Sequence, residues 1–196
     1  MKRALFIDRD GVINRMVRYQ DGFDSPLSPN EVKLVTGVEK VIKFANGRRI
    51  PVIEISNRPQ VAKGKTTKQM SKKVENKIHK LLKDKGARID MSYICPHHPN
   101  AILLELRIIC DCRKPKPGLL LKAAKENNID LKKSVFLGDK ATDVKAGKLA
   151  GCKTVLFLHD NDEPLKVKDA KKAKADYKVK SMREALSLAK KLLKTR

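Results

Sequence analysis

The chain has 196 residues, a formal net charge of +23 and 41% hydrophobic residues, and none of its apolar runs is long enough to cross a bilayer. A single domain of this length can bury enough surface to fold without disulfides. The positive charge would attract any polyanion, although lysines spread along the whole chain also fit a solvated surface. Because Asp8 interrupts the first apolar run before a signal-peptide core forms, we expect a cytoplasmic protein and one domain over residues 1–196.

Short apolar runs alternate with helical patterns along the chain. The helical patterns carry the usual end signals, such as a threonine cap at Thr66 or Thr67, a glycine stop at Gly86 and a capping box opening at Ser181. A polar linker follows residue 158. Strands are predicted at 3–8, 50–56, 89–94, 134–138, 153–158 and 175–179, and helices at 37–47, 66–85, 117–128, 141–151 and from 181 onward.

Most of the predicted strands are continuously apolar, which is typical of a parallel sheet covered by helices on both faces. The fold class is therefore α/β, a three-layer sandwich with a central parallel sheet. In such sheets, ligands bind beyond the carboxyl ends of the strands. The loops after Ile7, Ile55, Ile94 and Leu137 are where we expect the functional residues.

Two acidic clusters follow the first and fourth strands. Asp8 and Asp10 stand one residue apart in "FIDRDGVIN", and Asp139 and Asp143 stand about one helical turn apart in "FLGDKATD". Carboxylates this close favour a bound hard cation such as Mg²⁺, and one of them could act as a nucleophile toward phosphorus. Either cluster alone would as readily be a solvated strand end or a helix cap.

Two further loops offer hydrogen-bond donors and positive charge. Ser56 and Asn57 follow the second strand, where a hydroxyl and the start of a loop can donate to phosphate. Arg113 and Lys114 precede the helix that opens at Pro117. A serine at a strand end is usually a turn residue and a basic pair usually faces solvent, so each pair is weak evidence by itself.

The segment "CPHHPNAILLELRIICDC" contains a C-x-H pair and a C-x-C pair. Cys95, His97, Cys110 and Cys112 make a set of three sulfurs and one nitrogen that suits tetrahedral Zn²⁺. Four protein ligands leave no open position, so the zinc would be structural and would hold the loop at 95–112. A redox pair would usually read C-x-x-C, and reduced thiols without metal remain the alternative.

The order "FIDRDGVIN", "ISN", "RKPKPG" and "LGDKATDVKAG", together with "CPHHP" and "CDC", resembles the haloacid dehalogenase (HAD) superfamily of phosphatases that use an aspartate nucleophile. Within it, the chain is similar to the branch with a minimal cap that includes phosphatases of D-glycero-D-manno-heptose 1,7-bisphosphate and of histidinol phosphate. The resemblance extends from Leu5 to about Leu188. It supports the same four zinc ligands.

The resemblance implies a role for each matching residue. Asp8 would be the nucleophile and Asp10 the general acid and base, while Ser56 and Lys114 would hold the transferring phosphoryl group. The remaining implied roles are Mg²⁺ binding by Asp8, the backbone carbonyl of Asp10, and Asp139; substrate binding by Asn57, Arg58 and Arg113; and support by Lys140 and Asp143.

One departure from the branch concerns its second motif, which typically has a glutamine where this chain has Arg58. An added cation at that position could favour a substrate with a second anionic group. The best prediction is thus a Mg²⁺-dependent phosphatase of a small metabolite, with a heptose bisphosphate ahead of histidinol phosphate.

Nucleic-acid binding, or removal of a 3′-phosphate from nucleic-acid ends, is the main alternative from another class. Only 4% of the residues are aromatic, which disfavours a module that binds single strands by stacking. We therefore expect a monomer acting on a small phosphorylated metabolite, without a membrane partner, and with nucleic acid as a partner that is not favoured. An inactive protein that has retained the fold is a third reading, which the full set of charged motif residues disfavours.

Overall fold

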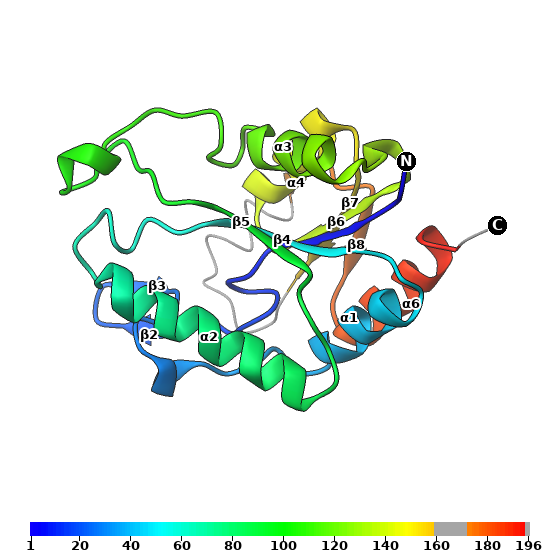
Figure 1. Cartoon of the computed structure of the whole chain (residues 1–196), viewed down its shortest axis with the longest axis horizontal. Helices are drawn as coiled ribbons and strands as arrows, with labels where there is room; N and C mark the ends of the chain where they lie inside the picture. The colour runs from blue at the N-terminus through cyan, green and yellow to red at the C-terminus, as the bar shows by residue number, and fades with distance from the viewer. Residues whose placement is uncertain (159–171, 195–196) are drawn as a thin grey trace.

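A parallel sheet forms the centre of the molecule, as the computed structural model shows for residues 1–158 and 172–194. In this part of the chain its strands lie in the order β5-β4-β1-β6-β7-β8, and every neighbouring pair is parallel (Figure 1). The predicted α/β class and the predicted strands are confirmed. The strands are β1 (Leu5–Ile7), β4 (Val52–Asn57), β5 (Met91–Cys95), β6 (Val135–Gly138), β7 (Lys153–Phe157) and β8 (Tyr177–Val179).

Helices cover both faces of this sheet, which gives the expected three layers (Figure 1). One face carries α1 (Val38–Gly47), α2 (Lys68–Asp84) and α6 (Met182–Leu192), and the other carries α3 (Gly118–Asn127) and α4 (Ala141–Ala150). Short 3₁₀ helices lie at η1 (Pro29–Glu31), η2 (Leu104–Leu106) and η3 (Leu131–Lys133). Most of the predicted polar linker lies outside the described residues. None of the helices described here has the length and apolar composition to cross a bilayer.

The core is divided by the sheet into two layers, because successive strand residues point to opposite faces. Leu5 and Ile7 of β1 pack into the layer that includes α1, α2 and α6, whereas Phe6 packs into the layer that includes α3 and α4. Residues of β1 and β6 are buried throughout, so these strands are central. This explains why their sequences are continuously apolar.

A small hairpin lies between β1 and α1. Its strands, β2 (Val17–Tyr19) and β3 (Gly22–Asp24), pair antiparallel. The hairpin is attached to the loop after β4, because Gln60 Nε2 donates to Asp24 Oδ1 at 2.8 Å and to Ser25 Oγ at 3.0 Å. Lys65 Nζ forms a further ion pair with Asp24 at 2.9 Å. This hairpin is the only segment between β1 and α1 that forms strands among the described residues.

Replacement of Leu82 by alanine tests the packing of α2 against the sheet. Leu82 is 0% exposed in the core layer that includes α1, α2 and α6. We therefore expect Leu82→Ala to lower the free energy of unfolding by about 2–5 kcal/mol. The matched control is Leu121→Ala on α3, whose side chain is 46% exposed and should cost less than about 1 kcal/mol. Urea denaturation measures both, and equal losses would show that α2 is not packed as described.

Candidate active site

The loops at the carboxyl ends of β1, β4 and β6 surround a cavity of about 350 Å³. These are strand ends at which the sequence predicts functional residues. The predicted residues that line it are Asp8, Asp10, Ser56, Asn57, Arg113, Lys114, Lys140 and Asp143. Asp139 and Arg58 are not among the lining residues.

A buried lysine is at the centre of this site. Lys114 Nζ lies 2.8 Å from Asp8 Oδ1 and 2.7 Å from Asp143 Oδ1, and it donates to the carbonyl of Ile55 at 2.9 Å. The side chains of Asp8, Lys114 and Asp143 are all at most 5% exposed. One ammonium group therefore pairs with a carboxylate that follows β1 and with a carboxylate on α4.

The two carboxylates exceed the charge of this one ammonium. Burial raises the pKa of Asp8, as does repulsion from Asp143, while attraction to Lys114 opposes both. Burial would lower the pKa of Lys114, but Asp143 and Asp8 raise it above its ordinary value. The site thus keeps Lys114 protonated and would favour a further cation beside Asp8.

Carboxylate oxygens of Asp8, Asp139 and Asp143 lie within 4.8 Å of one another, and this donor set suits Mg²⁺. A positive charge already lies among them, because Lys140 Nζ is 3.6 Å from Asp139 Oδ2 and donates to the carbonyl of Asp10 at 3.3 Å. Gly11 makes room for Asp139. Its φ is +98°, and a Cβ there would lie 2.2 Å from Asp139 Oδ2.

Asp10 differs from Asp8 because its carboxylate is bound by an arginine that the sequence analysis did not single out. Arg9, which is 0% exposed, donates from Nε at 3.0 Å and from Nη2 at 2.7 Å to Asp10 Oδ1. Asn14 Nδ2 donates to the same oxygen at 3.0 Å. Burial would raise the pKa of Asp10, but the charges of Arg9 and Arg58 hold it well below its ordinary value.

Ser56 and Asn57 are the last two residues of β4, and their side chains have different surroundings. Ser56 is 1% exposed, and its Oγ has no hydrogen-bond partner among the described residues. The Asn57 amide exchanges two hydrogen bonds of 3.0 Å with the backbone N–H and C=O of Lys114. Asn57, which the sequence assigns to substrate, therefore also fixes the backbone of Lys114.

The resemblance implies that Arg58 binds substrate. Arg58 does not line the cavity. Its side chain is buried within electrostatic reach of Arg9, Asp10 and Glu54. Burial, followed by repulsion from Arg9, lowers the pKa of Arg58 to about 10. Pro59 and Gln60, which follow Arg58 in the loop after β4, line the cavity.

The hairpin described above forms the opposite side of the cavity. Met16, Phe23, Asp24 and Ser25 all line it. The stretch after Asn14 therefore helps to shape the pocket. A cap of this size leaves a cavity that fits a small molecule.

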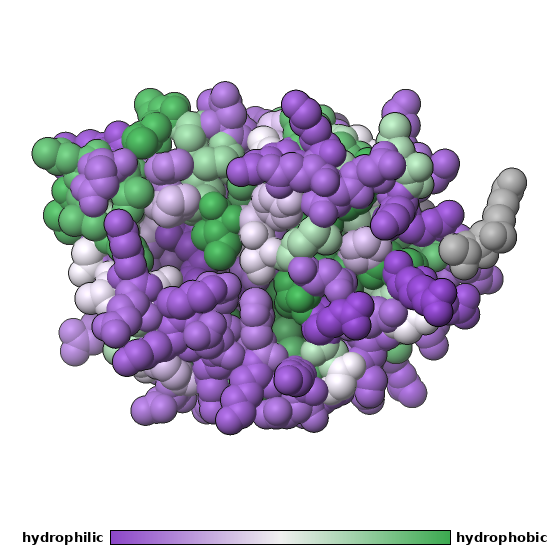
Figure 2. All heavy atoms as spheres, in the orientation of Figure 1, coloured by the Kyte–Doolittle hydropathy of each residue, from purple (hydrophilic) through white to green (hydrophobic). Residues whose placement is uncertain are grey.

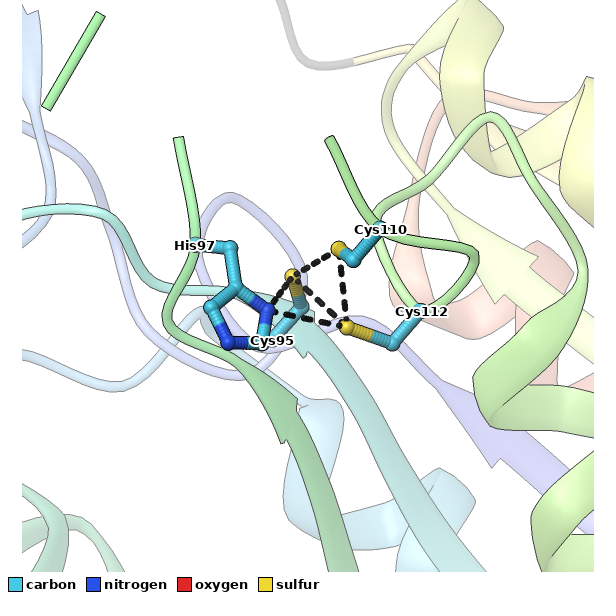
Figure 3. Close-up of side chains that lie close together, drawn as sticks. All are labelled: Cys95, His97, Cys110 and Cys112. Atoms are coloured by element: carbon cyan, nitrogen blue, oxygen red, sulfur yellow. Dashed lines mark hydrogen bonds between the residues drawn. The ribbon is translucent and has the colours of Figure 1, made fainter. Parts of the chain in front are cut away.

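Cys95, His97, Cys110 and Cys112 converge on one point, as Figure 3 shows. Their sulfurs lie 3.0–3.6 Å apart, and His97 Nδ1 lies 3.3 Å from Cys112 Sγ and 3.8 Å from Cys95 Sγ. Tetrahedral Zn²⁺ with bonds of about 2.3 Å would spread sulfurs to nearly 3.8 Å, so the set fits this ion after a small expansion. All four cysteines of the chain are free thiols.

This cluster is linked directly to the cavity. Arg113 follows Cys112 in the chain, and its Nη1 donates to the carbonyl of His97 at 3.0 Å. Arg113 also lines the cavity. The loop that the cluster closes therefore determines where Arg113 points.

Comparison with known proteins agrees with this geometry. A sequence model of the HAD-hydrolase-like family matches residues 111–185. The chain is 34% identical over 165 residues to D-glycero-alpha-D-manno-heptose-1,7-bisphosphate 7-phosphatase of Photorhabdus laumondii, covering 83% of this chain and 87% of that protein. It is 32% identical to the D-glycero-beta-D-manno-heptose-1,7-bisphosphate 7-phosphatase of Pasteurella multocida, covering 97% and 98%.

A solved structure has the same architecture. The crystal structure of D,D-heptose 1,7-bisphosphate phosphatase from B. bronchiseptica, complexed with magnesium and phosphate, superposes with a TM-score of 0.77 at 25% identity and covers 98% of each chain. The resemblance inferred from the motifs is thereby confirmed. The chain belongs to the HAD-like family of hydrolases, in the branch of these relatives.

Proposed function

We propose that the chain is a Mg²⁺-dependent phosphatase that acts through an aspartyl-phosphate on a sugar bisphosphate, as a D-glycero-D-manno-heptose 1,7-bisphosphate 7-phosphatase. The observation that carries the proposal is the ion pair of Asp8 with Lys114 in a small cavity, beside the carboxylates of Asp139 and Asp143. The names of the relatives support the choice of substrate. One relative is named for the alpha anomer and the other for the beta anomer.

Asp8 is the proposed nucleophile. Its carboxylate lies in the cavity at the end of β1, and the Arg9 backbone N–H donates to Oδ1 at 2.8 Å, which fixes the carboxylate's orientation. Attack on phosphorus forms the Asp8 acyl-phosphate and releases the sugar hydroxyl. Hydrolysis of the acyl-phosphate then restores the carboxylate.

Asp10 is the proposed acid for the leaving oxygen and the base for the attacking water. Because Arg9 favours its ionised form, its carboxyl group must turn from Arg9 toward the substrate before it can carry a proton. Asp10 lines the cavity, so a rotation of the side chain is sufficient to reach it.

Lys114 and the Ser56 hydroxyl are the proposed donors to the phosphoryl oxygens. Lys114 is kept protonated by its two carboxylates, and the unpartnered Ser56 Oγ is free to donate. Asp8, Asp139 and the backbone carbonyl of Asp10 would hold Mg²⁺, which supplies charge neutralisation at the phosphoryl group when bound. Asp143 positions Lys114 and accepts from the Lys140 N–H at 2.9 Å.

Arg113 is the proposed contact for the part of the substrate that does not react. It lies on the wall of the cavity together with Lys63, and the two cations suit a second phosphate group. Arg58 is not a proposed contact for the substrate, because it does not line the cavity.

A phosphate-release screen tests the proposed function. With Mg²⁺ present, both anomers of the heptose bisphosphate should be compared with hexose bisphosphates, histidinol phosphate, nucleotides and 3′-phosphorylated oligonucleotides. We expect at least one heptose bisphosphate to exceed histidinol phosphate, which has a single phosphate group, by about tenfold or more in kcat/KM, since a charge-assisted contact to the second phosphate contributes about 1.5–3 kcal/mol. Release of phosphate from none of them would exclude the proposal.

Replacement of Asp8 by asparagine tests the mechanism. Asp8→Asn retains the shape of the side chain and removes its nucleophilicity, so kcat should fall by about 10³-fold or more. Asp84→Asn, which removes an exposed carboxylate from α2, is the matched control and should leave kcat unchanged. If Asp8→Asn kept most of the activity, the covalent mechanism would be wrong.

Metal analysis and thermal unfolding test the proposed zinc site. The protein should contain close to one zinc per chain, and Cys110→Ser should lose it and lower the Tm, because the cluster would then have three ligands. Cys152→Ser is the control, since Cys152 is buried elsewhere and should keep the zinc. A folded wild-type protein with no bound zinc would contradict a structural site.

A further inference from the structure

The loop between the two halves of the Cys/His cluster presents an exposed aliphatic surface, which we call the apolar tip. It consists of Ile102, Leu104, Ile108 and Ile109, with exposed fractions of 68%, 72%, 43% and 83%. Figure 1 draws this loop, with η2, projecting from the body at the left, and Figure 2 shows hydrophobic side chains gathered at that corner. The other large hydrophobic side chains that are exposed in the described residues lie outside this loop, at Met1, Leu121 and Leu149.

The backbone of the loop holds these side chains away from the core. Ile102 N–H donates to the carbonyl of Ala62 at 2.8 Å, and His98 N–H donates to the carbonyl of Leu106 at 3.0 Å. Arg107 Nε donates to the carbonyl of Ala101 at 2.8 Å. With the Cys/His cluster closing its ends, the loop cannot turn the tip inward without breaking these bonds.

Exposed aliphatic side chains that gather on one surface usually mark a site of association. Beside Ile108 and Ile109 is a groove of about 240 Å³, whose wall also includes Pro99, Pro115 and Arg113. The tip itself is convex and contains no aromatic ring. It therefore lacks the stacking surface that binding of single-stranded nucleic acid requires.

The charge around the apolar tip distinguishes between two further partners, a second copy of the chain and an anionic lipid bilayer. The chain carries a net charge of +23, and Arg107 and Arg113 lie beside the tip, with Lys63 next to the segment that anchors it. A second copy would bring the same charge and be repelled. An anionic bilayer offers hydrocarbon to the aliphatic side chains and negative headgroups to the lysines and arginines.

We propose that the apolar tip inserts into the surface of an anionic lipid bilayer and docks the protein there. Lys63 and Arg113 also line the cavity, so docking would bring one edge of the cavity next to the headgroups. This binding is reversible and peripheral, because a few aliphatic side chains insert and no helix of the described residues crosses the bilayer. It does not depend on the proposed function.

Vesicle co-sedimentation tests the docking. The zinc-loaded protein is mixed with vesicles of phosphatidylcholine alone, or of phosphatidylcholine with phosphatidylglycerol. We expect binding to the mixed vesicles only, weakened by salt. The double variant Leu104→Ser with Ile109→Ser should reduce the partition coefficient by at least about tenfold, because both changes remove aliphatic surface and leave the charge unaltered.

The matched control is the double variant Leu121→Ser with Leu149→Ser, which removes exposed leucines from α3 and α4 and should bind like the wild type. Zinc content and phosphate release should be unchanged in both variants, which shows that each is folded. The proposal is overturned if the wild type does not bind mixed vesicles, or if the tip variant binds them equally well. It is also overturned if light scattering shows a dimer that the tip variant converts to a monomer.

Discussion

The site depends on the contacts that the buried ammonium group of Lys114 makes. It joins Asp8 after β1, Asp143 on α4 and the carbonyl of Ile55 on β4 within a buried space, at 2.7–2.9 Å. A buried charge without partners costs several kcal/mol, so each of these elements must come to the lysine for the fold to be stable. The same contacts that stabilise the fold therefore assemble the cavity. The excess negative charge that remains around Asp8 would favour a divalent cation there.

The position of Lys114 depends in turn on the Cys/His loop. Lys114 follows Cys112 by two residues, Asn57 binds its backbone on both sides, and Arg113 donates to the carbonyl of His97. A structural ion in the cluster would thus act on the reaction only through these bonds, by limiting the directions that Arg113 and Lys114 can take. The Cys/His cluster and the cavity are separate sites joined by a few residues of backbone, which explains why a loop far from Asp8 in sequence lies next to it in the fold.

The parallel sheet and the place of the cavity follow from patterns that are visible in sequence. Continuous apolar runs indicate buried parallel strands, whose carboxyl ends share one edge, and the motifs beginning at Asp8, Ser56 and Asp139 fall at those ends. Side-chain partners were less predictable. In a D-x-D pattern the middle residue carries no signal of its own, so the pattern does not predict the hydrogen bonds from Arg9 to Asp10. The burial of Arg9 depends on the tertiary packing around it. The bond of Asn57 to Lys114 joins residues 57 positions apart, so local sequence carries no signal for it.

Arg58 shows how a residue that departs from the family motif can add a buried charge near a site without lining its cavity. Arg58 and Arg9 are 6% and 0% exposed and repel each other, a combination that is stable only with buried negative charge nearby. Asp10 and Glu54 supply that charge, and Glu54 lies on β4 only four residues before Arg58. The added cation is therefore balanced within the protein by Asp10 and Glu54. Arg113, by contrast, lines the cavity and donates to the carbonyl of His97 in the loop of the Cys/His cluster.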